Sequence, residues 1–285
     1  MLVPTCRSMS GAYARLIGLL RELGSVAVAF SGGVDSTLLL QAAREALGER
    51  AVAVTVRSRF VPARELESAA AFCAAAGIRQ VLLDVDTLAI PGVADNPPER
   101  CYLCKKALFT QIAETARSLG LQWVAEGSNL DDLGDYRPGM RAIRELGVRS
   151  PLLDAGLRKS EIRALSQALA LPTWDKPAMA CLATRFVTGQ PIRASALSRV
   201  EAAEDWLTAQ GFRQLRVRDH GELARLELDE AGMSRLRDPA LAAAVHEALR
   251  SLGYRWVTLD LGGYQMGSMN NTDMGEKHEI QHRII

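Results

Sequence analysis

The sequence lacks both an excess of charge of one sign and any long hydrophobic run. Its 285 residues contain 34 Lys and Arg against 33 Asp and Glu, a formal net charge of +1, so no general attraction to nucleic acid is expected. No apolar run reaches the ~20 residues that span a membrane. Arg15, Arg21 and Glu22 interrupt any signal-peptide core. These absences predict a soluble, cytoplasmic protein with neither a membrane nor a nucleic-acid partner.

Cysteine is scarce, with five residues in the chain. In a cytoplasmic protein, paired cysteines more often bind a metal or act in catalysis than form disulfides. Cys101 and Cys104 form a Cys-x-x-Cys pair where a loop meets a helix, beside cationic residues that favour thiolate. With Cys181 they could be part of a redox pair, a zinc site completed by His220, or a 4Fe–4S cluster with one iron left open. Spacing alone does not separate these three interpretations.

The segment 26–37 reads VAVAFSGGVDST and predicts a strand, a glycine turn and the start of a helix. Backbone N–H groups at a helix N-terminus bind anions, and the paired glycines allow a phosphate to approach the backbone. No Gly-Lys-Ser/Thr follows, so this is not a Walker loop. The string resembles the pyrophosphate loop of ATP pyrophosphatases, which split ATP between its α and β phosphates. The alternative is an ordinary glycine turn. The candidate phosphate-binding residues are Ser31, Gly32, Gly33, Val34, Asp35, Ser36 and Thr37.

Strand and helix patterns alternate after this loop. Apolar runs predict strands at 51–58, 79–86 and 121–127, with helices at 62–76 and 106–120. Such alternation is typical of a doubly wound α/β fold with a parallel sheet, in which ligands bind beyond the carboxyl ends of the strands. Besides the glycine loop, the candidate nucleotide- or metal-binding residues at these ends are Glu126, Gly127, Asn129 and Asp132.

A change in composition precedes a second, smaller region. Residues 172–193 contain three prolines and mixed polar residues, which indicates a structured loop. Beyond it, helices are predicted at 194–210 and 239–251, a β-hairpin at 212–229 and a strand at 254–261. This pattern is typical of a small α+β unit. We therefore expect two domains, 1–190 and 191–285.

Five strings that occur in one order carry a more specific resemblance. They are SGGVDS, NPPERCYLCKKALF, AEGSNLDDLGDYRPGMRA, LPTWDKPAMACLATR and LDLGGYQMGSMN. Together they resemble the LarE family of ATP-dependent sulfur transferases, which acts in assembly of the nickel-pincer nucleotide cofactor. The resemblance covers nearly the whole chain. It implies a PP-loop ATP pyrophosphatase fold, with ATP and Mg²⁺ as cofactors. The implied reaction adenylates the carboxylates of pyridinium-3,5-biscarboxylic acid mononucleotide and converts them to thiocarboxylates. We also expect a homo-oligomer that works with other proteins of the nickel-pincer pathway.

Members of this family obtain their sulfur in two ways. In one variant the cysteine of ACLATR, here Cys181, gives up its own sulfur and becomes dehydroalanine. In the other, that cysteine and an earlier Cys-x-x-Cys pair, here Cys101 and Cys104, bind a 4Fe–4S cluster whose open iron carries an extra sulfide. This sequence has all three cysteines. It therefore resembles the cluster-bearing variant.

Further charged residues complete the expected site. Asp35 is the expected carboxylate for Mg²⁺, a role compatible with that of a helix N-terminal charge, whereas Asp131 is expected to face water. Arg137 is a candidate ligand for a phosphate. Strand alternation places Arg216 and Arg218 on one face, suited to the phosphate of the substrate mononucleotide. The alternative for these two arginines is a solvated strand face.

Three other functions share parts of this pattern. A tRNA thiolase uses the same loop and paired cysteines, but the near-neutral charge and the absence of a recognisable RNA-binding appendage disfavour it. An amidating ligase with the same loop has no need of the three cysteines. A metal-carrying protein with a vestigial loop is disfavoured because SGGVDS is intact.

Overall fold

The structure is a computed structural model that describes residues 6–134, 138–177 and 180–265. The chain divides into two compact units, the first formed by 1–91 and 101–181 and the second by 92–100 and 182–285. The short segment 92–100 therefore belongs with the C-terminal part of the chain. The boundary near residue 190 that the sequence suggests stays a prediction.

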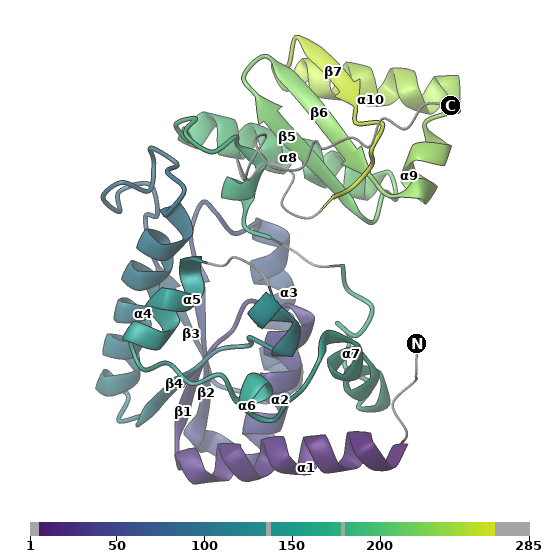
Figure 1. Cartoon of the computed structure of the whole chain (residues 1–285). Helices are drawn as coiled ribbons and strands as arrows, with labels where there is room; N and C mark the ends of the chain where they lie inside the picture. Colours follow the sequence, from purple (N-terminus) through teal and green to yellow (C-terminus); the bar gives the residue numbers. More distant parts are fainter. Residues whose placement is uncertain (1–5, 135–137, 178–179, 266–285) are drawn as a thin grey trace, which may run out of the picture. The chain divides into compact units, whose positions relative to one another are not determined.

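The first unit contains a four-stranded sheet in the order β3-β2-β1-β4. All three strand pairs are parallel, as Val26 opposite Ala51 and Val26 opposite Trp123 illustrate for β1. Parallel neighbours require crossover connections, and helices supply them (Figure 1). The doubly wound parallel sheet predicted from the sequence is confirmed. The strands are β1 (Val26–Ala29), β2 (Ala51–Arg57), β3 (Gln80–Asp84) and β4 (Trp123–Ala125).

Alternation along the strands produces two apolar layers. Val26 and Val28 pack on one face with α1, α2, α3 and α7, whereas Ala27 packs on the other with α4 and α5 (Figure 1). Because both faces are covered, these strands are short hydrophobic runs instead of alternating ones. The helices are α1 (Cys6–Leu23), α2 (Val34–Leu47), α3 (Ala63–Ala75), α4 (Arg100–Ser118), α5 (Pro138–Glu145), α6 (Pro151–Asp154) and α7 (Lys159–Ala168), and the 3₁₀ turns are η1 (Gly48–Arg50) and η2 (Leu130–Gly134).

The second unit contains a three-stranded sheet in the order β5-β6-β7. β5 and β6 form the predicted antiparallel hairpin, and β7 pairs in parallel with β6. Helices α8 and α10 pack on a core that includes Leu207, Phe212 and Val217. This unit confirms the smaller C-terminal α+β region. Its elements are η3 (Leu182–Arg185), α8 (Ala194–Ala209), β5 (Leu215–His220), β6 (Leu223–Leu228), α9 (Glu230–Arg235), α10 (Pro239–Ser251) and β7 (Trp256–Leu259).

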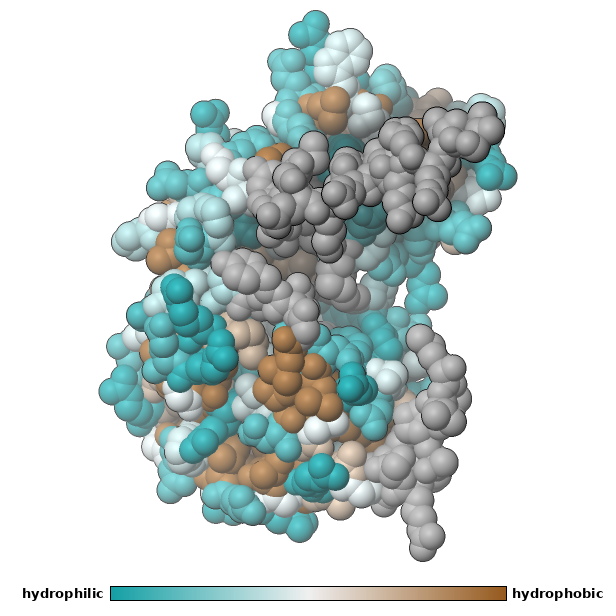
Figure 2. All heavy atoms as spheres, in the orientation of Figure 1, coloured by the Kyte–Doolittle hydropathy of each residue, from teal (hydrophilic) through white to brown (hydrophobic). Residues whose placement is uncertain are grey.

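Apolar side chains on the described surface are scattered among hydrophilic ones. Figure 2 shows teal residues mixed with smaller brown groups on the face it displays. The exposed large hydrophobics are Leu82, Leu133, Leu169, Trp174, Trp256 and Leu261. Among the described residues, none of the helices has both the length and the apolar character needed to cross a bilayer.

Candidate functional site

The glycine loop connects the end of β1 to the start of α2, as the sequence predicts. The hydroxyls of Ser31 and Ser36 lie 3.1 Å apart and share a hydrogen bond, and the Ser36 hydroxyl also donates to the Gly33 carbonyl at 3.2 Å. Gly32 has a φ of +71° and packs against α3, where a Cβ would lie 3.3 Å from Ala69 Cβ. This conformation strongly favours glycine. The loop is therefore held in a turn at the N-terminus of α2.

The seven candidate residues of this loop differ in accessibility. Ser31 is exposed and Gly33 and Asp35 are half-buried, whereas Gly32, Val34 and Ser36 are buried. Thr37 is fully buried, and its hydroxyl has no hydrogen-bond partner among the described residues. The accessible donors and acceptors of the loop thus come from its first half and from Asp35. The ligand roles of all seven residues stay predictions.

The end of β4 lies against this loop. The Asn129 amide donates to Asp35 Oδ1 at 3.2 Å, and Asn129 itself is buried. A Cβ on Gly127 would lie 3.1 Å from the Ser36 backbone nitrogen and 3.2 Å from Asp35 Cβ. Gly127 therefore permits the close approach of β4 and α2. The structure brings together two segments that are far apart in the sequence.

Replacing Gly127 by alanine is expected to push the end of β4 away from Asp35. The neighbouring atoms are backbone or Cβ and cannot rotate aside, so we expect a loss of about 1–3 kcal/mol in the free energy of unfolding, with weakened nucleotide binding. Urea unfolding and calorimetry measure the two effects. Gly147→Ala is the control for a loss of stability alone. Its φ of +65° makes alanine strained there, but no atom lies within 4 Å of the added Cβ, so no neighbouring segment is displaced.

Glu126 and its neighbours fix the loop after β4. The Glu126 carboxylate accepts hydrogen bonds from the Ser150 hydroxyl at 2.6 Å, the Ser128 hydroxyl at 2.8 Å and the Ser128 backbone at 3.1 Å. Asp132 accepts from the Asn129 backbone at 2.9 Å. These contacts organise the turn that presents Asn129. Direct binding of nucleotide or metal by Glu126 and Asp132 stays a prediction.

Two lysines that the sequence reading missed lie at the glycine loop. Lys159, at the start of α7, forms an ion pair with Asp35. Lys176 donates to Glu65 Oε2 at 2.7 Å and to the Gly32 carbonyl at 3.0 Å. The sequence offered one indication of such lysines, namely that the glycine loop contains no lysine of its own. A phosphate-binding loop of this kind would need cations from elsewhere in the chain, but the missing lysine does not identify the residues that supply them.

Asp131 is exposed, as expected, and its carboxylate also has hydrogen-bond partners. Although exposed, its carboxylate accepts from the Lys159 backbone at 2.7 Å and from Arg158 Nη1 at 3.0 Å. It thereby satisfies the backbone N–H of the first residue of α7. Asp131 therefore positions Lys159 beside Asp35.

The cysteines occupy different environments. Cys101 and Cys104 are half-buried in the first turns of α4, three residues apart and hence on one face of the helix. Cys181 is exposed, and Cys73 is buried in α3, where burial raises the pKa of its thiol to about 11. Among the described residues no three His, Cys, Asp or Glu side chains are grouped to hold a metal. The donors suit an iron–sulfur cluster chemically, but in this conformation they do not form one ligand set.

The segment that follows Cys181 is held by arginines of the second unit. Arg185 is fully buried and pairs with Glu204 through bonds of 2.9 and 3.0 Å. Arg100 donates to the Ala183 carbonyl at 2.9 Å. Arg100 directly precedes Cys101 and Ala183 follows Cys181 by two residues, so this bond joins the backbone segments that carry the cysteines.

Arg216 and Arg218 share one face of β5, as expected, but that face is buried. Both are 3% exposed, so the solvated-face alternative is wrong. Arg218 pairs with Glu227 at 2.6 Å and donates to the Thr184 carbonyl at 2.8 Å. The pKa of Arg216 is lowered to about 10, chiefly by burial and next by the charge of Arg185.

Glu204 balances part of this positive charge. Burial by itself raises the pKa of Glu204, but the charge and hydrogen bonds of Arg185 outweigh burial, and the pKa lies below its ordinary value. His220 lies exposed at the end of β5 in the second unit. Arg137, the other candidate for a phosphate, lies outside the described residues.

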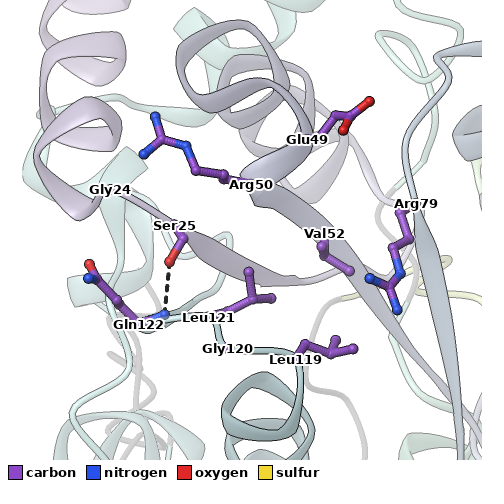
Figure 3. A pocket seen from close by; sticks show the side chains of 10 residues that line it. All are labelled: Gly24, Ser25, Glu49, Arg50, Val52, Arg79, Leu119, Gly120, Leu121 and Gln122. Carbon is purple, nitrogen blue, oxygen red and sulfur yellow. Dashed lines mark hydrogen bonds between the residues drawn. The ribbon is translucent and has the colours of Figure 1, made fainter.

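A cavity of about 360 Å³ opens at the end of the first sheet where its strands begin, opposite the end that carries the glycine loop (Figure 3). Four of its lining residues, Ser25, Arg50, Arg79 and Gln122, each directly precede one of the four strands. The Ser25 hydroxyl accepts from the Gln122 backbone at 3.0 Å, the bond dashed in Figure 3. Because the glycine loop follows β1, this cavity lies at the other ends of the strands from that loop.

The fold and the loop define the class of protein. A parallel doubly wound sheet with SGGVDS between β1 and α2 is the arrangement of a PP-loop ATP pyrophosphatase, and the family model described as queuosine biosynthesis protein QueC matches residues 25–94. The chain is 37% identical over 260 residues to the pyridinium-3,5-bisthiocarboxylic acid mononucleotide synthase of Lactiplantibacillus plantarum, covering 91% of this chain and 94% of that protein. The chain belongs to the family of that synthase, the LarE family.

Two other relatives are similar to this chain. An uncharacterized protein of Synechocystis is 42% identical over 249 residues, which cover 87% of this chain and 93% of that protein. The glutamine-hydrolyzing GMP synthase of Aeropyrum pernix is 26% identical over 82% of this chain, but the match covers 47% of the synthase. That match is therefore to a part of a different enzyme.

Proposed function

We propose that this protein is an ATP-dependent sulfur transferase that adenylates the carboxylates of pyridinium-3,5-biscarboxylic acid mononucleotide and converts them to thiocarboxylates. The observation that carries the proposal is the similarity to the L. plantarum synthase over nearly the whole length of both chains. The intact glycine loop, with Asp35 beside Asn129 at the sheet edge, agrees with it. In the pathway, the product is a ligand prepared for nickel.

The chemistry explains why ATP is needed. A carboxylate is a poor acyl donor, because an oxide would have to leave when sulfur attacks. Adenylation makes AMP the leaving group and releases pyrophosphate. The backbone N–H groups at the start of α2 are suited to the phosphates, and the exposed Ser31 adds a hydroxyl.

Asp35 is the residue we assign to Mg²⁺. Its carboxylate is half-buried at the start of α2, next to the place where we expect the phosphates of ATP to bind. Mg²⁺ is usually held by one or two carboxylates together with substrate phosphates, so this donor fits. When bound, the ion would spread the charge that develops on the triphosphate.

The test of this function is pyrophosphate release. The purified protein with ATP and Mg²⁺ should release pyrophosphate when the pyridinium mononucleotide is present, without tRNA or a nitrogen donor. Release that requires tRNA, or that requires ammonia or glutamine, would favour the two rival PP-loop functions. No release with any of these would disprove the enzymatic proposal.

We assign the phosphate of the substrate mononucleotide to Arg216 and Arg218. Burial, and next the positive charge of Arg185, lowers the pKa of Arg216, and an anion bound beside these arginines would offset that charge. Arg218 is less available, because it also holds Glu227 and the Thr184 carbonyl.

Arg216→Met is the substitution that tests this assignment. It removes one charge from a cluster rich in arginine, so the unit should stay folded. We expect the dissociation constant of the pyridinium mononucleotide to rise about 10- to 100-fold, the range for one charge-assisted hydrogen bond, with ATP affinity unchanged. Calorimetry with each ligand measures both. Unaltered affinity for the mononucleotide would assign Arg216 a purely structural role.

We propose that Cys101, Cys104 and Cys181 together bind a 4Fe–4S cluster, and that Cys181 is a catalytic residue of the sulfur transfer. The bond from Arg100 to the Ala183 carbonyl supports a shared site, since it links the two cysteine-bearing segments. Binding would require their side chains to converge from the described conformation. The alternative is that Cys181, which is exposed, is itself consumed as the sulfur source.

Three further assignments complete the proposal. We assign the protein to the cytoplasm, where paired cysteines more often bind a metal or act in catalysis than form disulfides. We expect it to form a homo-oligomer, and to pass its product to other proteins of the nickel-pincer pathway. Size-exclusion chromatography with light scattering measures the oligomeric state.

A further inference from the structure

We propose that Lys159 and Lys176 bind the pyrophosphate part of ATP, and that each leaves a carboxylate of this chain to do so. The inference rests on the ATP use proposed above and adds to it the cations that the glycine loop lacks. Both lysines belong to the first unit and lie at opposite ends of the loop. Lys159 contacts Asp35 and Lys176 contacts Gly32.

The side chain and the backbone of Lys176 are both held by several contacts. Its ion pair with Glu65 is mostly buried, with side chains 19% and 9% exposed. The backbone of its segment is fixed by Arg163 of α7, which donates to the Trp174 and Lys176 carbonyls, each at 2.7 Å. A buried ion pair contributes little net stability because both charges are desolvated. Its position, with the ammonium 3.0 Å from the Gly32 carbonyl, points to a role at the phosphate loop.

Lys159 is positioned from the other side. Asp131 holds its backbone at the start of α7, and its ammonium is paired with Asp35. That carboxylate is the one assigned to Mg²⁺. Bound phosphate would attract Lys159 and so release Asp35 for the metal.

The charges agree with this exchange. In the structure, each lysine is paired with one carboxylate, Lys159 with Asp35 and Lys176 with Glu65. The Mg²⁺ complex of ATP carries about two net negative charges near neutral pH, and two ammonium groups balance them. In the absence of a Walker lysine, these two residues supply that charge from outside the loop.

The experiment measures dissociation constants by calorimetry for Mg²⁺–ATP, Mg²⁺–pyrophosphate and AMP. Lys176→Met alone leaves Glu65 as an uncompensated buried charge, so the main variant is Lys176→Met/Glu65→Gln, which removes both charges. We expect ATP and pyrophosphate to bind about 10- to 100-fold more weakly, with AMP affinity within about twofold. Lys159→Met should show the same pattern. Arg50→Met, at the opposite edge of the sheet, is the control and should bind all three like the wild type.

Glu65→Gln separates phosphate binding from a structural role. This change frees Lys176 from its carboxylate, so ATP and pyrophosphate should bind as tightly as in the wild type or more tightly. A purely structural ion pair predicts weaker binding instead. Three outcomes would each overturn the inference: weaker binding of ATP and pyrophosphate by Glu65→Gln, wild-type ATP affinity in the double variant, and equal losses of affinity for AMP and ATP. A wild-type protein that binds no ATP would show that the proposed function itself has failed.

Discussion

Asp35→Ala is expected to reduce pyrophosphate release by about 10²–10³-fold, the range for loss of one strong electrostatic contact in an active site. The carboxylate is half-exposed at the start of α2 and contacts Asn129 and Lys159. Its removal takes away the proposed Mg²⁺ ligand and leaves Lys159 unneutralised. The core beneath it is untouched, so the melting temperature should change little. A coupled assay for pyrophosphate with the pyridinium mononucleotide measures the loss.

Asp35→Asn sharpens this test, because it keeps the size of the side chain and its ability to accept from Asn129. If the charge matters, Asp35→Asn should be as inactive as Asp35→Ala, and excess Mg²⁺ should not restore it. Asp154→Ala removes an exposed carboxylate from the end of α6 and should behave like the wild type. Full pyrophosphate release by both Asp35 variants would remove Asp35 from the nucleotide site.

The glycine loop was predictable because its information is local. Strand, turn and helix start are encoded within residues 26–37, and the structure places β1 and α2 on either side of the turn. Parallel topology followed from the alternation of strands and helices. Ligands of such sheets bind beyond the carboxyl ends of the strands, which predicted that Gly127 and Asn129 lie near the loop, as they do.

The lysines were missed because their contacts are not local. Lys159 lies 124 positions from Asp35, and Lys176 lies 144 positions from Gly32. No periodicity reports such pairs. The burial of the arginines of β5 was not predictable for a related reason. Alternation predicts that Arg216 and Arg218 share a face of the strand. Whether that face is buried depends on residues distant in the sequence, Glu204 of α8 and Glu227 of β6. Local pattern sets direction, whereas tertiary packing sets burial and charge.

Cys181→Ala is expected to abolish formation of the thiocarboxylate while pyrophosphate release continues. The exposed thiol lies outside the glycine loop, so activation of the carboxylate does not need it. Sulfur transfer does, whether the thiol is a cluster ligand or the donor. Chromatography of the product and the coupled pyrophosphate assay measure the two steps on the same sample. Loss of both steps together would place Cys181 in nucleotide binding or folding instead.

The other cysteines decide which sulfur source operates. With a cluster, Cys101→Ala and Cys104→Ala should lose thiolation as completely as Cys181→Ala, and anaerobic preparations of each should lose iron and acid-labile sulfide. Cys73→Ala, which removes a buried thiol from α3, should retain both. Mass spectrometry of the wild type after turnover should then find Cys181 intact. A loss of about 34 Da at Cys181, the conversion of thiol to dehydroalanine, together with full activity in Cys101→Ala, would instead establish the sacrificial mechanism.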